Sequence, residues 1–140
     1  MAFEKRNIVA VDDSAIVLKT LEKVLGNRFE LHSFSGGARA LQYLKSRTPD
    51  LIILDIDMPE IDGYEMLKQI KEKDHLVDVP VIFLTSNNDK SYVIKAVAGG
   101  AKDYCVKPIN EEILIEKVCA QLHEPVEEDR IVWDTAEPSL

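Results

Sequence analysis

Residues 51–63 read LIILDIDMPEIDG, a pattern that predicts a buried strand and the loop that follows it. The first four residues are apolar without alternation, which is typical of a strand covered on both faces in a parallel sheet. Asp55 then stands at the carboxyl end of this strand, where open parallel sheets bind their ligands. Pro59 and the pair Asp62-Gly63 favour turns. This segment therefore predicts a carboxylate at the rim of a sheet.

The rest of the chain alternates strand patterns with helical patterns. Apolar runs predict strands at residues 7–11, 28–34, 81–84 and 103–106. Helical spacing predicts helices at residues 15–25, 35–44, 63–73 and 111–123, and another that follows Asp89 and ends at Ala98. Residues 28–34 carry the weakest strand signal and are expected nearer a sheet edge. Such alternation predicts an α/β fold with a doubly wound, five-stranded parallel sheet, right-handed crossovers and five helices in two layers.

The composition limits the classes of protein to consider. With 140 residues, 46% of them hydrophobic, the chain is long enough for one domain with its own core. The net charge of −8 leaves no basic footprint for direct binding of nucleic acid. No apolar run is long enough to cross a membrane, and residues 1–6 do not resemble a signal peptide. We therefore expect a cytoplasmic protein without membrane association.

Residues 124–140 differ in composition from the rest of the chain. They contain six acidic residues and one basic residue around a single apolar island at residues 131–133. So short a segment cannot form a domain. We therefore predict a folded domain at residues 1–123 and an acidic tail or linker at residues 124–140. A solvated tail is the simpler interpretation, and the alternative is that Trp133 docks on a partner surface.

The cysteines and histidines do not indicate a metal site or a disulfide framework. Cys105 and Cys119 are too few and too far apart for a zinc motif, so both are expected to be reduced and packed. His32, His75 and His123 show no ligand spacing, and we interpret all three as surface or half-buried residues.

Acidic residues follow the first strand as well as the central one. If the strand order is 2-1-3-4-5, the first and third strands are neighbours, and Asp12, Asp13 and Asp55 converge where the order reverses. Three carboxylates so close repel one another, so they take up protons or share a cation. Three hard oxygen ligands, with water at the remaining positions, match Mg²⁺. Ca²⁺ is less suitable, because the chain has no twelve-residue loop that would wrap one ion.

Two more strand ends bring a cation and a hydroxyl to the same rim. Lys107 follows the fifth strand and Thr85 follows the fourth. A carboxylate at a metal can act as a nucleophile toward phosphorus, and phosphoryl transfer needs mainly alignment and charge neutralisation. Either residue alone is more often structural than functional. The conjunction at four strand ends predicts a site that holds a phosphoryl group.

Together these motifs resemble the receiver domain of two-component response regulators. The resemblance covers about residues 5–123 and depends on Asp12-Asp13, Asp55 with Met58-Pro59, Asp62-Gly63, Thr85-Ser86, Tyr104 and Lys107-Pro108. It implies a flavodoxin-like fold in which Asp55 accepts a phosphoryl group from a phosphohistidine on a sensor histidine kinase or a histidine phosphotransfer protein. Such a domain is not a conventional enzyme, but it assists its own phosphorylation and autodephosphorylation.

The same resemblance implies a ligand set and a set of phosphoryl contacts. The implied Mg²⁺ ligands are Asp12, Asp13, Asp55 and the backbone carbonyl of Asp57. Thr85 and Lys107 would contact the phosphoryl oxygens. The Lys107-Pro108 bond would be cis, which only proline allows at small energetic cost.

The resemblance also implies a switch and its readers. Thr85 and Tyr104 occupy the positions of a threonine that moves toward the phosphoryl group and an aromatic ring that turns inward. Phosphorylation would then change the face formed by the fourth helix, the fifth strand and the fifth helix. That face would control an effector protein or a C-terminal output domain, and a phosphorylation-dependent homodimer is a further assembly that the resemblance allows.

Two other interpretations compete with this one. Asp55-Ile56-Asp57 after an apolar strand also fits the Asp-x-Asp motif of haloacid dehalogenase-type phosphatases. That motif normally ends the first strand of a longer chain with a cap, and Asp12-Asp13 would then lack a role. A pseudo-receiver, which has the fold but is not phosphorylated, is disfavoured by the intact acids, Thr85 and Lys107. Turnover of a generic phosphate ester would favour the phosphatase, and failure to bind Mg²⁺ would favour the pseudo-receiver.

Overall fold

The structure, a computed structural model, confirms the predicted alternation of strands and helices. It describes residues 5–86 and 90–126, with side chains from residue 94 onward in the second range. The strands are β1 (Asn7–Val11), β2 (Glu30–Phe34), β3 (Leu51–Asp55), β4 (Val81–Thr85) and β5 (Asp103–Val106). The helices are α1 (Ala15–Leu25), α2 (Gly37–Leu44), α3 (Gly63–Lys71), α4 (Lys90–Ala98) and α5 (Glu111–Leu122).

Several element boundaries differ from the prediction by one or two residues, and the physical reason is clear at two of them. β2 begins two residues later than expected, because the N–H groups of Arg28 and Phe29 donate to the carbonyl of Leu25 and so belong to the turn after α1. α3 ends at Lys71, and the N–H of Lys73 donates to the carbonyl of Ile70 in the turn that follows. In both places a local turn satisfies backbone groups that the sequence pattern had assigned to a regular element.

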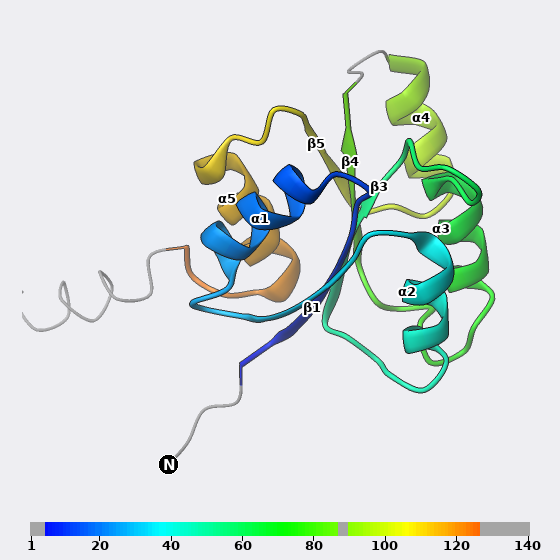
Figure 1. Ribbon diagram of the computed structural model, residues 1–140, viewed down its shortest axis with the longest axis horizontal. Coiled ribbons are helices and arrows are strands. Elements are labelled where there is room, and N and C mark those ends of the chain that lie inside the picture. Colours follow the sequence, from blue (N-terminus) through cyan, green and yellow to red (C-terminus); the bar gives the residue numbers. More distant parts are fainter. Residues whose placement is uncertain (1–4, 87–89, 127–140) are drawn as a thin grey trace, which may run out of the picture.

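The five strands form one parallel sheet in the order β2-β1-β3-β4-β5. Helices α1 and α5 cover one face, and α2, α3 and α4 cover the other (Figure 1). This is the predicted doubly wound, flavodoxin-like arrangement, with β2 at an edge as expected. The order reverses between β1 and β3, and the crevice at the carboxyl ends of these two strands is where such folds bind ligands.

The central strands are apolar throughout because each serves two cores. Successive side chains of a strand point to opposite faces. In β3, Ile52 and Leu54 join the core beneath α2, α3 and α4, whereas Leu51 and Ile53 join the core beneath α1 and α5. All four are fully buried. The unbroken run of four apolar residues is thus explained by helices on both faces of the sheet.

Side-chain caps start three helices close to the rim. Ser14 Oγ accepts a hydrogen bond from the N–H of Val17 at the start of α1, and Asp62 Oδ1 accepts one from the N–H of Glu65 at the start of α3. Asn110 caps α5 in the same way. Because such caps satisfy N–H groups that the first turn leaves free, they fix where each helix begins. The caps therefore fix the points at which the rim loops join α1, α3 and α5.

Gly63 lies where the loop after β3 returns to the strand. A Cβ at this position would lie 2.5 Å from the carbonyl oxygen of Asp55 and 2.7 Å from Cα of Ile56. We expect Gly63→Ala to lower the free energy of unfolding by about 2 kcal/mol or more, because only backbone could move aside. Urea titration measures the change. Gly36→Ala is the matched control, since a Cβ there meets no atom within 4 Å; an equal loss in both variants would contradict the explanation.

The chain after α5 is held against the start of β1 and the α1–β2 turn. The Glu124 carboxylate pairs with Nε of Arg6 at 3.1 Å and with Nη2 of Arg28 at 3.3 Å. Arg28 Nη1 also donates to the carbonyl of Val126 at 3.0 Å. Trp133 and the rest of the predicted tail from residue 127 lie outside the described residues, so the prediction for the tail stands untested.

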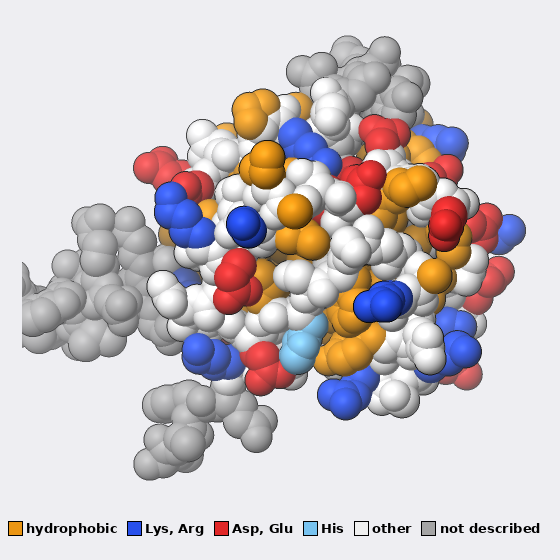
Figure 2. Space-filling model, viewed as in Figure 1, with side chains coloured by type: hydrophobic (Ala, Val, Ile, Leu, Met, Phe, Trp, Pro, Cys, Tyr) orange, Lys and Arg blue, Asp and Glu red, His pale blue; other side chains and the backbone are white. Residues whose placement is uncertain are grey.

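The remaining features of the surface and core agree with the composition. Cys105 and Cys119 are both buried and free, as expected. Burial raises the pKa of the Cys105 thiol to about 11, so it stays protonated at neutral pH. Acidic and basic side chains are interspersed over the face shown in Figure 2. No helix among the described residues is long and apolar enough to cross a membrane.

Candidate functional site

Two neighbouring strands deliver the three predicted acids to one place. Val11 pairs with Leu54 in the register of β1 and β3, so Asp12 and Asp55 stand one residue further along adjacent strands. Carboxylate oxygens of Asp12, Asp13 and Asp55 all lie within 4.8 Å of one another. Asp12 and Asp55 are buried, and Asp13 is exposed. The predicted convergence at the switch point is therefore present.

Lys107 joins this cluster from β5. Its Nζ lies 2.9 Å from Oδ2 of Asp12 and 3.2 Å from Oδ1 of Asp55. The backbone N–H of Lys107 donates to the carbonyl of Thr85 at 2.7 Å, which ties the lysine to the end of β4. The Lys107-Pro108 bond is cis, as the resemblance implied. One ammonium thus faces two buried carboxylates.

The electrostatics of the cluster are governed by burial. Burial, together with the charge of Asp12, raises the pKa of Asp55 from 3.8 to about 6, although Lys107 and the N–H of Asp57 act in the opposite direction. Burial alone would lower the pKa of Lys107, but the nearby carboxylates of Asp12 and Asp55, 2.9 and 3.2 Å from its Nζ, raise that pKa above its usual value. At neutral pH the site therefore holds a charged lysine and a mostly ionised Asp55.

One buried oxygen tests whether a cation fits here. Asp12 Oδ1 accepts a hydrogen bond from the N–H of Ser14, whereas Asp12 Oδ2 makes no hydrogen bond of regular geometry within the described residues, despite the short distance to Lys107 Nζ. A buried acceptor without a well-directed donor is uncommon and calls for an explanation. Three carboxylates with spare lone pairs suit a hard divalent cation such as Mg²⁺. The donor set therefore fits a metal.

The other predicted residues lie around this centre. Thr85 is buried at the end of β4, and Tyr104 is half-buried on β5, directly opposite Phe83. The Asp57 side chain is exposed, and the Asp57 N–H donates to Oδ1 of Asp55 at 3.3 Å. The roles that the resemblance assigned to these residues stay predictions.

Sequence reasoning did not single out the side chains that surround Tyr104. Lys117 Nζ lies 5.2 Å from the centre of the Tyr104 ring and 2.6 Å from Oδ1 of Asp103. Asp103 on β5 and Lys117 on α5 are fourteen residues apart in the chain, and no spacing rule predicts that they meet. Only the packing of α5 beside β5 brings them together.

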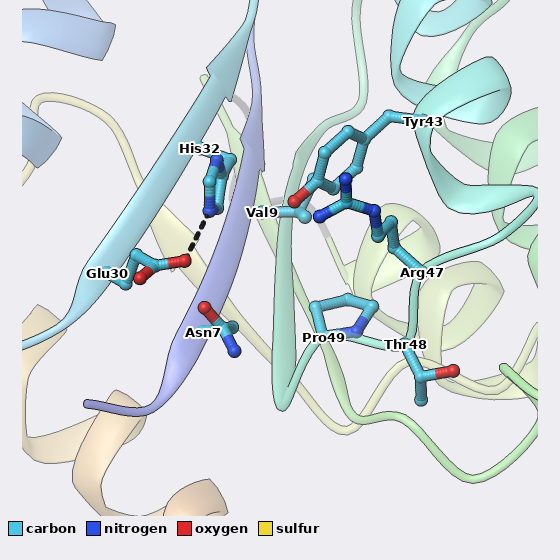
Figure 3. Close-up of a pocket in the computed structure, with 8 residues that line it drawn as sticks. All are labelled: Asn7, Val9, Glu30, His32, Tyr43, Arg47, Thr48 and Pro49. Atoms are coloured by element: carbon cyan, nitrogen blue, oxygen red, sulfur yellow. Dashed lines mark hydrogen bonds and ion pairs between the residues drawn. The ribbon is translucent and has the colours of Figure 1, made fainter. Parts of the chain in front are cut away.

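A separate cavity of about 110 Å³ lies at the other end of the sheet (Figure 3). It is lined by Asn7, Val9, Glu30, His32, Tyr43, Arg47, Thr48 and Pro49. Asn7 begins β1 whereas Asp12 follows its end, so this cavity is remote from the acidic cluster. His32 Nε2 lies 2.8 Å from Oε2 of Glu30, and its ring centre lies 5.3 Å from that of Tyr43 with the planes tilted by 32°. His32 is thus a half-buried residue with protein partners, as expected.

The raised pKa of Asp55 predicts how metal-free stability depends on pH. Because folding favours the protonated form, Asp55 contributes stability that is fully present below its unfolded pKa and is lost as pH rises through about 4 to 6. We expect the free energy of unfolding in EDTA to fall by about 3 kcal/mol over this window. Urea titrations of wild type and Asp55→Asn isolate the effect, since the variant lacks the carboxyl. Parallel pH profiles for the two proteins would contradict the prediction.

Comparisons with known proteins agree on one family. The family model described as the response regulator receiver domain matches residues 8–119. Chemotaxis protein CheY of Bacillus subtilis is 36% identical over 113 residues, which are 79% of this chain and 92% of that protein. The DNA-binding transcriptional regulator NtrC of Escherichia coli is 38% identical over 125 residues, which are 86% of this chain but 26% of NtrC. The crystallised chemotaxis protein CheY4 of Vibrio cholerae superposes with a TM-score of 0.80 at 27% identity, covering 84% of this chain and 99% of that one.

Proposed function

The chain belongs to the response regulator receiver domain family, and from this premise we propose that it is a phosphoacceptor switch of two-component signalling in which Asp55 is the acceptor. The observation that carries the proposal is the meeting of the Asp12, Asp13 and Asp55 carboxylates within 4.8 Å, with Lys107 Nζ 3.2 Å from Asp55. A lone buried carboxylate would repel an anionic phosphoryl group. Positive charge beside Asp55 reduces this repulsion, so the group can approach.

The donor in this proposal is a phosphohistidine on a sensor histidine kinase or a histidine phosphotransfer protein. A carboxylate oxygen of Asp55 attacks phosphorus, a P–O bond forms and the P–N bond breaks. The electron pair of that bond leaves on the ring nitrogen of the donor histidine, which takes a proton from water to become neutral imidazole. Lys107 is placed to balance the negative charge that the phosphoryl group adds beside Asp55. The product is an acyl phosphate on Asp55.

The proposed metal ligands are the carboxylates of Asp12, Asp13 and Asp55 and the backbone carbonyl of Asp57. Bound Mg²⁺ would screen the repulsion between Asp55 and an incoming phosphoryl group. Asp12 Oδ2 supports this assignment, because it makes no regular hydrogen bond although Lys107 Nζ lies 2.9 Å away, and it could be shared with a divalent cation. The Lys107 ammonium lies 2.9 Å from Asp12 and 3.2 Å from Asp55, so it offsets part of their negative charge.

Signal leaves, in this proposal, through Thr85, Tyr104 and the α4–β5–α5 face. Thr85 ends β4 and its backbone carbonyl accepts a hydrogen bond from the N–H of Lys107, so the ends of β4 and β5 that carry the threonine and the lysine are tied together. The partner would be an effector protein or an output domain. The family includes both arrangements, since CheY is little longer than the matched region whereas NtrC is far longer. A phosphorylation-dependent homodimer and a cytoplasmic location belong to the same proposal.

The proposal is tested with acetyl phosphate, a donor that needs no cognate kinase. We expect intact-mass spectrometry to show one phosphoryl group per chain in Mg²⁺ and none in EDTA. Without the cation, the three carboxylates repel the negatively charged acetyl phosphate. Mg²⁺ binding without labelling would support a pseudo-receiver. Continuous turnover of p-nitrophenyl phosphate would support a haloacid dehalogenase-type phosphatase. A labelled fraction that is independent of Mg²⁺ would contradict the metal site.

A further inference from the structure

Asp103 and Lys117 form a closed unit with Tyr104, one of the two proposed switch residues. Oδ1 of Asp103 accepts a hydrogen bond from the backbone N–H of Tyr104 at 2.8 Å and pairs with Lys117 Nζ at 2.6 Å. The same ammonium lies 5.2 Å from the centre of the Tyr104 ring, within the range of a cation–π interaction. One carboxylate oxygen therefore holds both the backbone of Tyr104 and the cation on its ring.

The surroundings make this unit stronger than an exposed pair. The side chains of Asp103 and Lys117 are each only 27% exposed, so water screens their charges incompletely. The Tyr104 ring packs against the core beneath α2, α3 and α4. Beside the ring lies a pocket of about 200 Å³ lined by Tyr104, Cys105, Val106, Asn110, Ile113 and Lys117. The ring thus has space next to it, and Lys117 lies at the boundary of that space.

The charge on Lys117 opposes any movement of this ring. If Tyr104 turns away, the ring loses its contact with the ammonium. To follow the ring, the ammonium would have to give up its 2.6 Å ion pair with Asp103. Leaving the observed ring position therefore costs the cation–π energy. No interaction of similar kind would be lost if Lys117 were uncharged.

We propose that Lys117 is a latch that sets the resting equilibrium of Tyr104. This deepens the proposed function, on which it depends for the idea that the Tyr104 ring changes position. To move the Tyr104 ring to its second position, a ligand or modification must supply at least the free energy that stabilises the first. Lys117 would thereby set how strongly phosphorylation of Asp55 must act before the α4–β5–α5 face responds. Lys117 is a positioning residue, with no contact to the reacting atoms.

The test removes the positive charge of Lys117 by substitution with methionine, which keeps an apolar side chain of similar length. Wild type, Lys117→Met, Lys117→Arg and the exposed-lysine control Lys102→Met are labelled with 3-fluorotyrosine, and the Tyr104 resonance is assigned with Tyr104→Phe. ¹⁹F relaxation dispersion on the unphosphorylated proteins reports the population of the second ring position. Loss of the cation–π interaction in Lys117→Met should raise the population of the second ring position roughly two- to fivefold. Lys117→Arg and Lys102→Met should match wild type.

An unchanged Tyr104 population in Lys117→Met, or an equal rise in Lys102→Met, would overturn the latch. If Lys117→Met fails to fold, Asp103→Asn replaces it, because the amide oxygen keeps the Tyr104 N–H bond while releasing the ammonium. A rise in that variant supports the proposal and no rise overturns it. Acetyl phosphate labelling of wild type runs in parallel. Its absence would reject the phosphoacceptor function, whereas the dispersion measurement on unphosphorylated protein would still decide the latch.

Discussion

Asp55→Asn is expected to abolish phosphoryl labelling from acetyl phosphate, while Asp57→Asn leaves it within about twofold of wild type. An amide cannot form the acyl phosphate, so loss at the nucleophile should be complete. Asp57 presents only its backbone to the cluster: its N–H reaches Asp55 Oδ1 at 3.3 Å and its carboxylate faces solvent. Mass spectrometry of intact protein measures the label, and hydroxylamine sensitivity identifies it as an acyl phosphate.

This pair of variants also separates the competing chemistries. In a haloacid dehalogenase-type phosphatase the second acid of Asp-x-Asp acts as general acid/base, so Asp57→Asn would stop turnover. In the proposed receiver it should not stop acceptance of the phosphoryl group. Undiminished, hydroxylamine-sensitive labelling of Asp55→Asn would place the nucleophile on another residue. Circular dichroism of each variant checks that loss of label does not reflect loss of fold.

Lys107→Met should have the second-largest effect, on stability and on switching together. The substitution leaves the carboxylates of Asp12 and Asp55, which are 0% and 2% exposed, without the ammonium that lies 2.9 and 3.2 Å away. Removing one partner of a buried ion pair is strongly destabilising, and we expect a loss of about 3 kcal/mol at pH 7 in EDTA. Mg²⁺ should restore part of this loss, because a divalent cation replaces the missing charge.

The same variant should bind Mg²⁺ yet lose the phosphorylation-linked change at the α4–β5–α5 face. Amide hydrogen exchange with and without acetyl phosphate measures that change. Lys23→Met is the matched control, since Lys23 is 76% exposed and its Nζ lies 3.7 Å from Glu111; it should alter stability by less than about 1 kcal/mol. A normal exchange response in Lys107→Met would show that Lys107 has no part in the switch.

Much of the fold could be predicted because its signals are local. The four apolar residues 51–54 indicated burial on both faces, and the two cores that share β3 explain why no polar residue interrupts them. Residues 28–34 were harder, because β2 is an edge strand with a partly exposed side and a turn that overlaps its predicted start. The local pattern is weaker wherever burial is one-sided.

The candidate site was predictable to the extent that strand ends share a rim. Asp12, Asp13 and Asp55 could be expected together once β1 and β3 were taken as neighbours, and the sheet order confirms that they are. Lys107 was expected at the rim, facing the acids and able to contact phosphoryl oxygens, but its separate distances to the carboxylates could not be predicted. That it binds Asp12 at a shorter distance than Asp55 follows from where β5 and the Lys107-Pro108 turn place its side chain.

By itself, the sequence determined the order of strands and helices and which acidic and basic residues follow the strand ends. Periodicity and turn residues are properties of neighbours in the chain, so they predicted strands, helices and the acids at strand ends. The tertiary structure alone decided the distances and the burial. The ion pair of Asp12 Oδ2 with Lys107, the raised pKa of Asp55 and the contact of Lys117 with Tyr104 all depend on which atoms exclude water from one another. Those atoms come from segments far apart in the chain, and no local pattern encodes their separation.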